Sequence, residues 1–345
     1  MKQSQIGYYF IVMASIVIVL AGVKLAAGIL VPFLLSLFIA IILSPAYNFF
    51  KSKGMPDILS MSIVMIIFLL FLMLVARLIG NSITDFSANI DQYAERLTDY
   101  YKALSIFTQK LGLEIPVDEI ATIVNTKQIM LFSKSLLSGL GSVFTNSFVV
   151  IFTVIFMLLE STHFVKKINF TDNNKETMKH INQIFTQIKS YMVLKALVSF
   201  LTGLIVWMSL YFIGTDYAFL WGVLAFLLNF IPNIGSIIAA VPAVLITLVQ
   251  LGGISALIVS GLYVVINIIV GSVVEPKVMG RGLGLSTLVV FLSLIFWGWL
   301  LGLVGMLLSI PLTIMAKIIF SANEKTQWLS VLLGNGENLE KSQVQ

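Results

Sequence analysis

Residues 217–251 read YAFLWGVLAFLLNFIPNIGSIIAAVPAVLITLVQL, an uncharged run that is interrupted in its middle by the motif NFIPNIG at residues 229–235. Proline and glycine interrupt a helix there, and asparagine side chains can satisfy the backbone groups that are freed. The arms on either side, each about 14 residues and about 21 Å long, are too short to cross a bilayer core of about 30 Å. The run therefore predicts a re-entrant helical hairpin over residues 217–251, entered from the outside.

A second uncharged block covers residues 283–316 and is interrupted around Gly302 and Gly305. Arg281 precedes this block and Lys317 follows it. Because lysine and arginine are enriched at cytoplasmic ends, both ends of the block are expected in the cytoplasm, which predicts a second hairpin entered from the inside.

The two blocks share a faint internal similarity, FLWG at residues 219–222 against IFWG at residues 295–298. Each block follows one full span, and the two are expected to enter the membrane from opposite faces. Paired broken helices in inverted units are typical of secondary transporters, whose solute site lies near the midplane. The alternative is coincidence among glycine, tryptophan and proline in apolar sequence.

The composition excludes a water-soluble protein. Of 345 residues, 59% are hydrophobic and 11% are charged, with a mean hydropathy of +1.02, whereas soluble domains carry about 25% charged residues. The net charge of +5 indicates no nucleic-acid partner, and the absence of cysteine excludes disulfides and thiolate chemistry. The remaining uncharged runs long enough for full spans are 6–23, 25–50, 58–76, 135–159, 196–215 and 254–274.

These runs predict an all-α polytopic membrane protein with about six full transmembrane helices and two re-entrant helical hairpins, or seven to eight segments by conventional counting. The distribution of lysine and arginine places both termini in the cytoplasm. The predicted organisation is a three-span scaffold at 1–80, an extracytoplasmic amphipathic helical segment at 81–134, a fourth span at 135–160, a cytoplasmic basic amphipathic helix at 161–195, a transport core at 196–320 with hairpins at 217–251 and 283–316, and a cytoplasmic tail at 321–345.

Two water-facing segments carry apolar stripes at helical spacing. In residues 86–111 the stripe is heptad-like and needs a partner surface, either the same chain or another subunit. Its members are Phe86, Ile90, Tyr93, Leu97, Tyr100, Leu104, Phe107 and Leu111. Residues 175–195 are basic and amphipathic, which favours contact with membrane lipids of the anionic inner leaflet.

Charged groups within a membrane are costly and usually functional, which draws attention to the motif VVEPKVMGRGLG at residues 273–284. Its candidate residues are Glu275, Pro276, Gly280, Arg281 and Gly282. Here the proline is expected to end a helix, the glycines to allow a flexible crossing, and Lys277 and Arg281 to balance Glu275. Glu275 is either a gate or coupling carboxylate, or one half of an ion pair at the membrane interface.

Uncharged hydrogen-bonding residues supply the other candidates, Asn229, Asn233 and Asn267, together with Pro232 and Gly235 at the break. Polar groups among apolar walls would suit a small polyhydroxylated solute; the alternative is that the asparagines cap the broken helix.

Motifs for catalysis, nucleotides and metals are missing from the sequence. The glycines of GRGLG at residues 280–284 lack the spacing of a dinucleotide fingerprint, there is no Walker motif, and His163 and His180 form no metal motif. No enzyme activity, cofactor or metal is expected.

The blocks at residues 219–242 and 275–313 resemble the signature blocks of the autoinducer-2 exporter family, with further similarity at YMVLK (191–195) and VPF (31–33). The resemblance implies a multi-pass protein of the bacterial inner membrane that exports the quorum-sensing signal autoinducer-2. It also implies a homo-oligomer, expected to be a pentamer. It carries over no catalytic residue.

The sequence thus predicts a secondary transporter that exports autoinducer-2 by alternating access. Two alternatives stay open: a cation/proton antiporter of the same family, with Glu275 as the coupling acid, and a non-transporting oligomeric membrane scaffold that assembles through residues 86–111.

Overall fold

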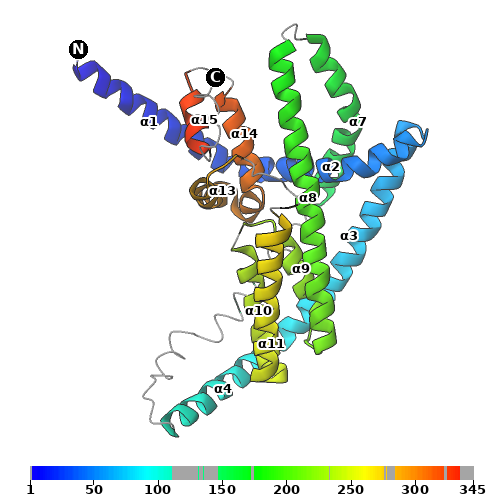
Figure 1. Ribbon diagram of the computed structural model, residues 1–345, viewed down its shortest axis with the longest axis vertical. Coiled ribbons are helices and arrows are strands. Elements are labelled where there is room, and N and C mark those ends of the chain that lie inside the picture. The colour runs from blue at the N-terminus through cyan, green and yellow to red at the C-terminus, as the bar shows by residue number, and fades with distance from the viewer. Residues whose placement is uncertain are drawn as a thin grey trace. The chain divides into compact units, whose positions relative to one another are not determined.

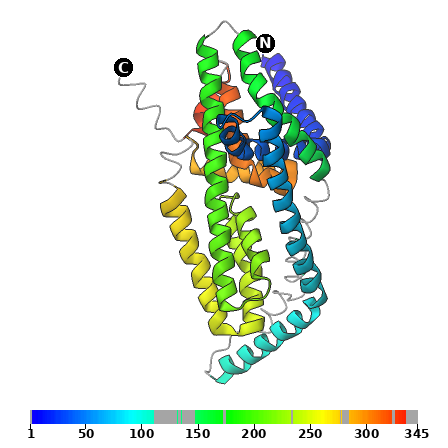
Figure 2. The ribbon, with the colours of Figure 1, turned by 90° about the vertical axis from the view of Figure 1, so that its right-hand side faces the viewer.

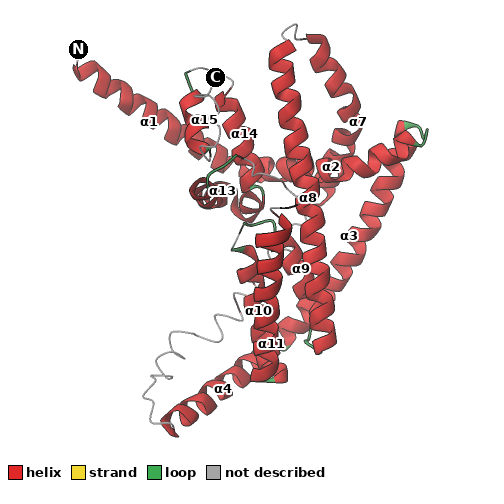
Figure 3. Cartoon of the chain, viewed as in Figure 1, coloured by secondary structure: helices red, strands yellow, loops and turns green. Residues whose placement is uncertain are grey.

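The computed structural model describes residues 2–110, 131, 135, 147–171, 175–232, 234–275, 277, 284–321 and 325–334. The regular structure of these residues is helical, with one isolated antiparallel bridge between Leu285 and Gly334 (Figure 3). Five helical segments of the described chain are long and apolar enough to cross a membrane, judged by length and composition: Ala27–Ser52, Asp57–Ala88, Thr186–Ile213, Gly253–Val274 and Thr287–Leu307. The predicted all-α polytopic class is confirmed.

The helices follow one another as labelled in Figure 1. Their bounds are α1 Lys2–Leu25, α2 Ala27–Ser52, α3 Asp57–Ala88, α4 Ile90–Lys110, α7 Ser147–Thr171, α8 Lys175–Ile213, α9 Ala218–Leu228, α10 Gly235–Leu251, α11 Gly253–Ile268 with a π-helical continuation Ile269–Val274, α13 Thr287–Leu307, α14 Ser309–Ser321 and α15 Gln327–Leu333.

The chain divides into two compact units. Unit 1 comprises Met1–Val64, Phe148–Val193 and Arg281–Gln345, and unit 2 comprises Met65–Ser147 and Leu194–Gly280. The chain passes between the two units four times, and two of these boundaries, at 64/65 and 193/194, fall inside α3 and α8. The second block of the sequence belongs to unit 1, and the first block belongs to unit 2.

In unit 2, residues 217–251 run out and back as a pair of packed helices, α9 and α10 (Figures 1 and 2). The two ends are joined: the Asp216 backbone N–H donates to Gln250 Oε1 at 2.7 Å, and Gln250 Nε2 donates to Asp216 Oδ1 at 2.9 Å. At the turn, Gly235 lies against the backbone carbonyl of Leu228, where a Cβ atom would overlap that oxygen. The break predicted at residues 229–235 is therefore the turn of a helical hairpin.

Helix α8 approaches α9 closely through two glycines of unit 2. A Cβ atom added to Gly203 would lie 2.7 Å from the Gly222 carbonyl oxygen, and one added to Gly222 would lie 2.6 Å from Trp207 Cβ. Small residues at such a crossing let two membrane helices pack backbone to backbone. This contact fixes the hairpin against α8.

The apolar stripe at residues 86–111 is divided between the end of α3 and α4, which are separated by Asn89. Phe86 and Tyr93 are buried, and the Phe86 ring lies 6.0 Å from the rings of both Tyr217 and Trp221. The first part of the stripe therefore packs on its own chain. The side chains of Leu97, Leu104, Phe107 and Leu111 lie outside the described residues.

The basic segment at 161–195 does not form a separate helix, because α7 extends to Thr171 and α8 runs unbroken from Lys175 to Ile213. The apolar residues Ile188, Tyr191 and Met192 of this segment are buried in the protein. The sequence predicted instead that the segment contacts lipids of the inner leaflet. The side chains before residue 186 lie outside the described residues.

In unit 1, the second block is broken where the sequence indicated. Gly302 has φ 68° and ψ −150°, which is not helical, and it interrupts α13. Gly305 then lies against the Trp297 carbonyl, and Trp297 Nε1 donates to Thr313 Oγ1 of α14 at 3.0 Å. Gly284, near the start of this block, is also bound to α14, because Lys317 Nζ of that helix donates to the Gly284 carbonyl at 2.5 Å.

Candidate functional site

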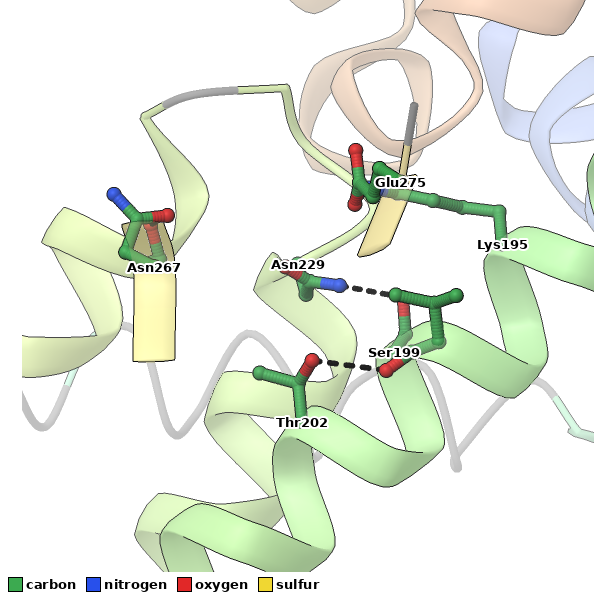
Figure 4. A network of polar contacts seen from close by, with 8 residues as sticks. Lys195, Ser199, Thr202, Asn229, Asn267 and Glu275 are labelled. Carbon is green, nitrogen blue, oxygen red and sulfur yellow. Dashed lines mark hydrogen bonds and ion pairs between the residues drawn. The ribbon is translucent and has the colours of Figure 1, made fainter. Parts of the chain in front are cut away.

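Three polar side chains follow one face of α8 in unit 2. Lys195, Ser199 and Thr202 stand at positions i, i+4 and i+7, and all three are buried. Figure 4 shows them with Asn229, Asn267 and Glu275 around them. A buried polar stripe at the start of the mostly apolar second half of α8 makes this face a candidate site.

Asn229 connects this stripe to the hairpin turn. It is the residue that follows the last turn of α9, it is buried, and its Nδ2 donates to Ser199 Oγ at 3.0 Å (Figure 4). On the next turn of α8, Thr202 Oγ1 donates to the Val198 carbonyl at 2.8 Å. The asparagine therefore holds the turn to α8.

A second polar bond connects the other side of the turn to α11. Ser236, at the start of α10, donates from Oγ to Asn267 Oδ1 at 2.8 Å. Among the described residues, the turn between α9 and α10 is thus attached by one neutral hydrogen bond to α8 and by another to α11.

These bonds surround a small enclosed cavity of about 10 Å³, which is about the space that one water molecule needs. Its polar lining comes from Thr202, Asn229, Ser236, Tyr263 and Asn267, and its apolar walls include Val206 and Ile266. Few polar groups among apolar walls are the usual make-up of a small-molecule site.

Tyr263 of α11 is the unusual member of the lining. Only 5% of its surface is exposed, and its hydroxyl is buried with no hydrogen-bond partner among the described residues. An unsatisfied buried hydroxyl costs about 1–3 kcal/mol. A molecule bound in the cavity could satisfy this hydroxyl.

An ion pair lies beside the cavity. Lys195 Nζ donates to Glu275 Oε1, and the lysine is only 3% exposed whereas the glutamate side chain is 25% exposed (Figure 4). Glu275 comes directly after the π-helical end of α11. The sequence predicted Lys277 and Arg281 as its partners, but the structure pairs it with a lysine 80 positions earlier; Arg281 lies outside the described residues.

The family is decided by similarity over nearly the whole chain: residues 13–325 match the family described as AI-2E family transporter. The chain belongs to the AI-2E transporter family. It is 40% identical over 326 residues to the AI-2 transport protein TqsA of Escherichia coli, covering 94% of this chain and 95% of that protein. It is 36% identical to the putative transport protein YhhT of Escherichia coli, covering 94% and 93%, and 26% identical to a sodium-lithium/proton antiporter of Halobacillus andaensis, covering 89% and 93%.

The AI-2E family member brings together only some of the residues that its sequence singled out. Asn229 and Asn267 line the cavity, Glu275 lies beside it, and Pro232 and Gly235 build the turn. Asn233, Pro276, Gly280, Arg281 and Gly282 lie outside the described residues.

Sequence reasoning missed five side chains of this site: Lys195, Ser199, Thr202, Ser236 and Tyr263. The first three carried a usable signal, since their spacing of four and three puts them on one helix face within an apolar span. Ser236 and Tyr263 carried none, because single serines and tyrosines are common in membrane helices.

Replacing Tyr263 with phenylalanine in this AI-2E family member should raise stability and lower transport. Removing an unsatisfied buried hydroxyl stabilises the folded protein by about 1 kcal/mol, while a solute in the cavity loses a hydrogen-bond partner. Thermal unfolding in detergent measures the stability, and the rate at which the variant moves its solute into liposomes measures transport. A transport rate equal to that of the wild type would show that the hydroxyl has no part in binding the solute.

Proposed function

We propose that this protein is a secondary transporter that exports the quorum-sensing signal autoinducer-2 by alternating access, with the cavity around Tyr263 as the solute site. The observation that carries the proposal is the Tyr263 hydroxyl, which has no hydrogen-bond partner among the described residues and belongs to a residue that lines the same cavity as Asn229 and Asn267. The 40% identity to a protein named as an AI-2 transport protein supports the choice of cargo.

The chemistry of the lining suits a neutral solute rich in hydroxyl groups. The bonds Asn229–Ser199 and Ser236–Asn267 close the cavity, and each joins two groups that can both donate and accept. A hydroxylated solute can take over these bonds without burying a charge, so the net change in free energy stays near 1 kcal/mol for each exchanged bond. The free energy lost when the turn opens is therefore close to the free energy gained when the solute forms the same number of hydrogen bonds.

The proposed setting is the bacterial inner membrane, with both termini in the cytoplasm. There the α9–α10 pair would re-enter the bilayer from the outside, and α13–α14 would re-enter from the inside. The bonds between Asp216 and Gln250 support the first return, because they hold both ends of the block at one place. The same proposal includes assembly of the protein as a homo-oligomer.

The deciding test is flux of autoinducer-2 and of sodium in liposomes that contain the purified protein. Wild type should move autoinducer-2, and Asn267→Ala should lower the rate about tenfold, as expected when the solute loses a bonding group and Ser236 loses its partner. Gly261→Ala is the matched control on α11, because no atom lies within 4 Å of the added Cβ. Wild-type protein that moves no autoinducer-2 under any ion gradient would remove the cargo assignment.

The Lys195–Glu275 pair favours a second candidate function, exchange of a cation for protons with Glu275 as the coupling acid. A carboxylate held by a buried ammonium can bind a proton or a metal cation only if that ammonium is released, which would link ion binding to movement of α11 against α8. Glu275→Gln should then abolish ion exchange in the same liposomes. Cation/proton exchange that survives this substitution would exclude the coupling role.

A further inference from the structure

Unit 2 contains a second hollow, a polar crevice at the opposite end of α9 from the cavity. Its volume is about 400 Å³, and its lining comes from α3, α4, the link between α8 and α9, and the end of α10. Its charged lining residues include Asp85 and Arg96. It is large enough for a small organic molecule, and its lining is mostly polar.

The crevice has a fixed hydrogen-bond acceptor in Asp216. One carboxylate oxygen accepts from the Tyr93 hydroxyl at 3.1 Å, and the other accepts from Gln250 Nε2 at 2.9 Å. Burial raises the pKa of Tyr93, so its hydroxyl remains a donor throughout the physiological range of pH. Two donors from two different helices hold this carboxylate in one orientation.

Tyr217 forms the wall beside that carboxylate in a strained conformation. Its φ of 58° is the one positive value among the described non-glycine residues, and for such a residue this conformation costs about 1–2 kcal/mol. Its hydroxyl lies 3.4 Å from that of Tyr93 and 3.5 Å from Asn89 Nδ2. Strain that persists in a polar hollow is typical of binding sites, because the surrounding contacts must hold it in place.

An apolar layer separates the crevice from the cavity. Trp221 and Leu224 of α9 and Leu210 of α8 are buried between the two, and Trp221 Nε1 donates to the Asp216 carbonyl at 2.9 Å. Along one face of α8 the order is therefore a charged residue, neutral polar residues, apolar residues and then the crevice. The cavity and the crevice are thus two polar sites in one unit, separated by a layer of apolar side chains.

We propose that the crevice is a second binding site for the same class of solute, a small neutral molecule rich in hydroxyl groups, on the far side of the apolar layer. Asp216 accepts from the solute and Arg96 donates to it, while Gln92 lies in the wall of the crevice. The aromatic side chains of Tyr93 and Tyr217 give it an apolar face to lie on. This inference rests on the proposed function for the identity of the solute.

The absence of native cysteine allows a direct test with the full-length protein in detergent, where both faces are accessible. Gln92→Cys places a thiol in the crevice, and Glu95→Cys places one on an exposed part of α4 that does not line it. With autoinducer-2 at ten times its Kd, the site is free about a tenth of the time, so labelling by a polar maleimide should slow about tenfold at residue 92. Labelling at residue 95 should be the same with and without autoinducer-2.

Equal labelling with and without autoinducer-2 at residue 92 would overturn the inference, and the Glu95→Cys rate shows whether the helix is folded. Flux in liposomes separates the two proposals. Autoinducer-2 flux without protection at residue 92 removes the crevice site and keeps the transport function. Protection at residue 92 in a protein that moves no autoinducer-2 keeps the binding site and removes the export function.

Discussion

Replacing Glu275 with glutamine should destabilise the protein by about 3 kcal/mol, because removing one partner of a buried pair leaves the other charge uncompensated. Lys195 would remain in a position that is only 3% exposed. The exposed quarter of the Glu275 side chain admits some water, which keeps the expected loss at the lower end of the range for buried pairs. Denaturant or thermal unfolding of the purified protein in detergent measures it.

A matched control exists in the exposed pair between Lys51 and Asp57, which are joined at 2.7 Å with 37% and 42% of their side chains exposed. Asp57→Asn should cost less than about 1 kcal/mol, since water replaces the lost partner. The double variant Lys195→Met, Glu275→Leu should recover most of the stability, because no charge is then left buried. Equal losses for Glu275→Gln and Asp57→Asn would mean that Lys195 finds another partner.

Replacing Gly235 with alanine should cost about 3 kcal/mol or more, because the added methyl group would overlap a backbone atom. That atom is the Leu228 carbonyl oxygen, which cannot rotate away as a side chain could. The turn would have to widen, which would separate Asn229 from Ser199 and Ser236 from Asn267. We therefore expect little folded protein, and loss of autoinducer-2 flux in whatever protein folds.

Gly261→Ala provides the comparison, since the new methyl group meets no atom within 4 Å and alanine favours a helix interior by about 1 kcal/mol. The yield of monodisperse protein and its unfolding temperature should be unchanged or higher. If Gly235→Ala gave the same yield and flux as this control, the tight turn would not be what positions the cavity.

The hairpin of unit 2 was predictable because its determinants are local. Proline, glycine and asparagine within seven residues break a helix wherever the chain is placed, and the length of each arm follows from the sequence. The same reasoning located the break in the second block, where Gly302 leaves the helical conformation and Gly305 packs on the Trp297 carbonyl.

The partner of Glu275 was not predictable in this way. The two nearest basic residues in the sequence, Lys277 and Arg281, were the natural choice, but a helix end can reach any residue that folding brings beside it. Lys195 is far away in the chain and becomes a neighbour only once α8 packs in the same unit as α11.

The orphan hydroxyl of Tyr263 was hidden for a related reason. Whether a tyrosine in an apolar helix has a partner depends on what lies opposite, and the cavity that Tyr263 lines also takes residues from α8 and from the turn between α9 and α10. Burial without a partner is a property of the packed structure and leaves no pattern in the sequence.

The non-helical backbone at Gly302 affects how an epitope tag at the C-terminal end is interpreted in topology mapping. Helix α13 meets every length and composition criterion for a crossing helix, yet its arm before Gly302 reaches only about 22 Å. If α13 and α14 together enter the membrane and return to the same side, as proposed, a hydropathy plot that reads α13 as a full span counts one membrane crossing too many. An epitope fused behind α15 would then be assigned to the wrong compartment.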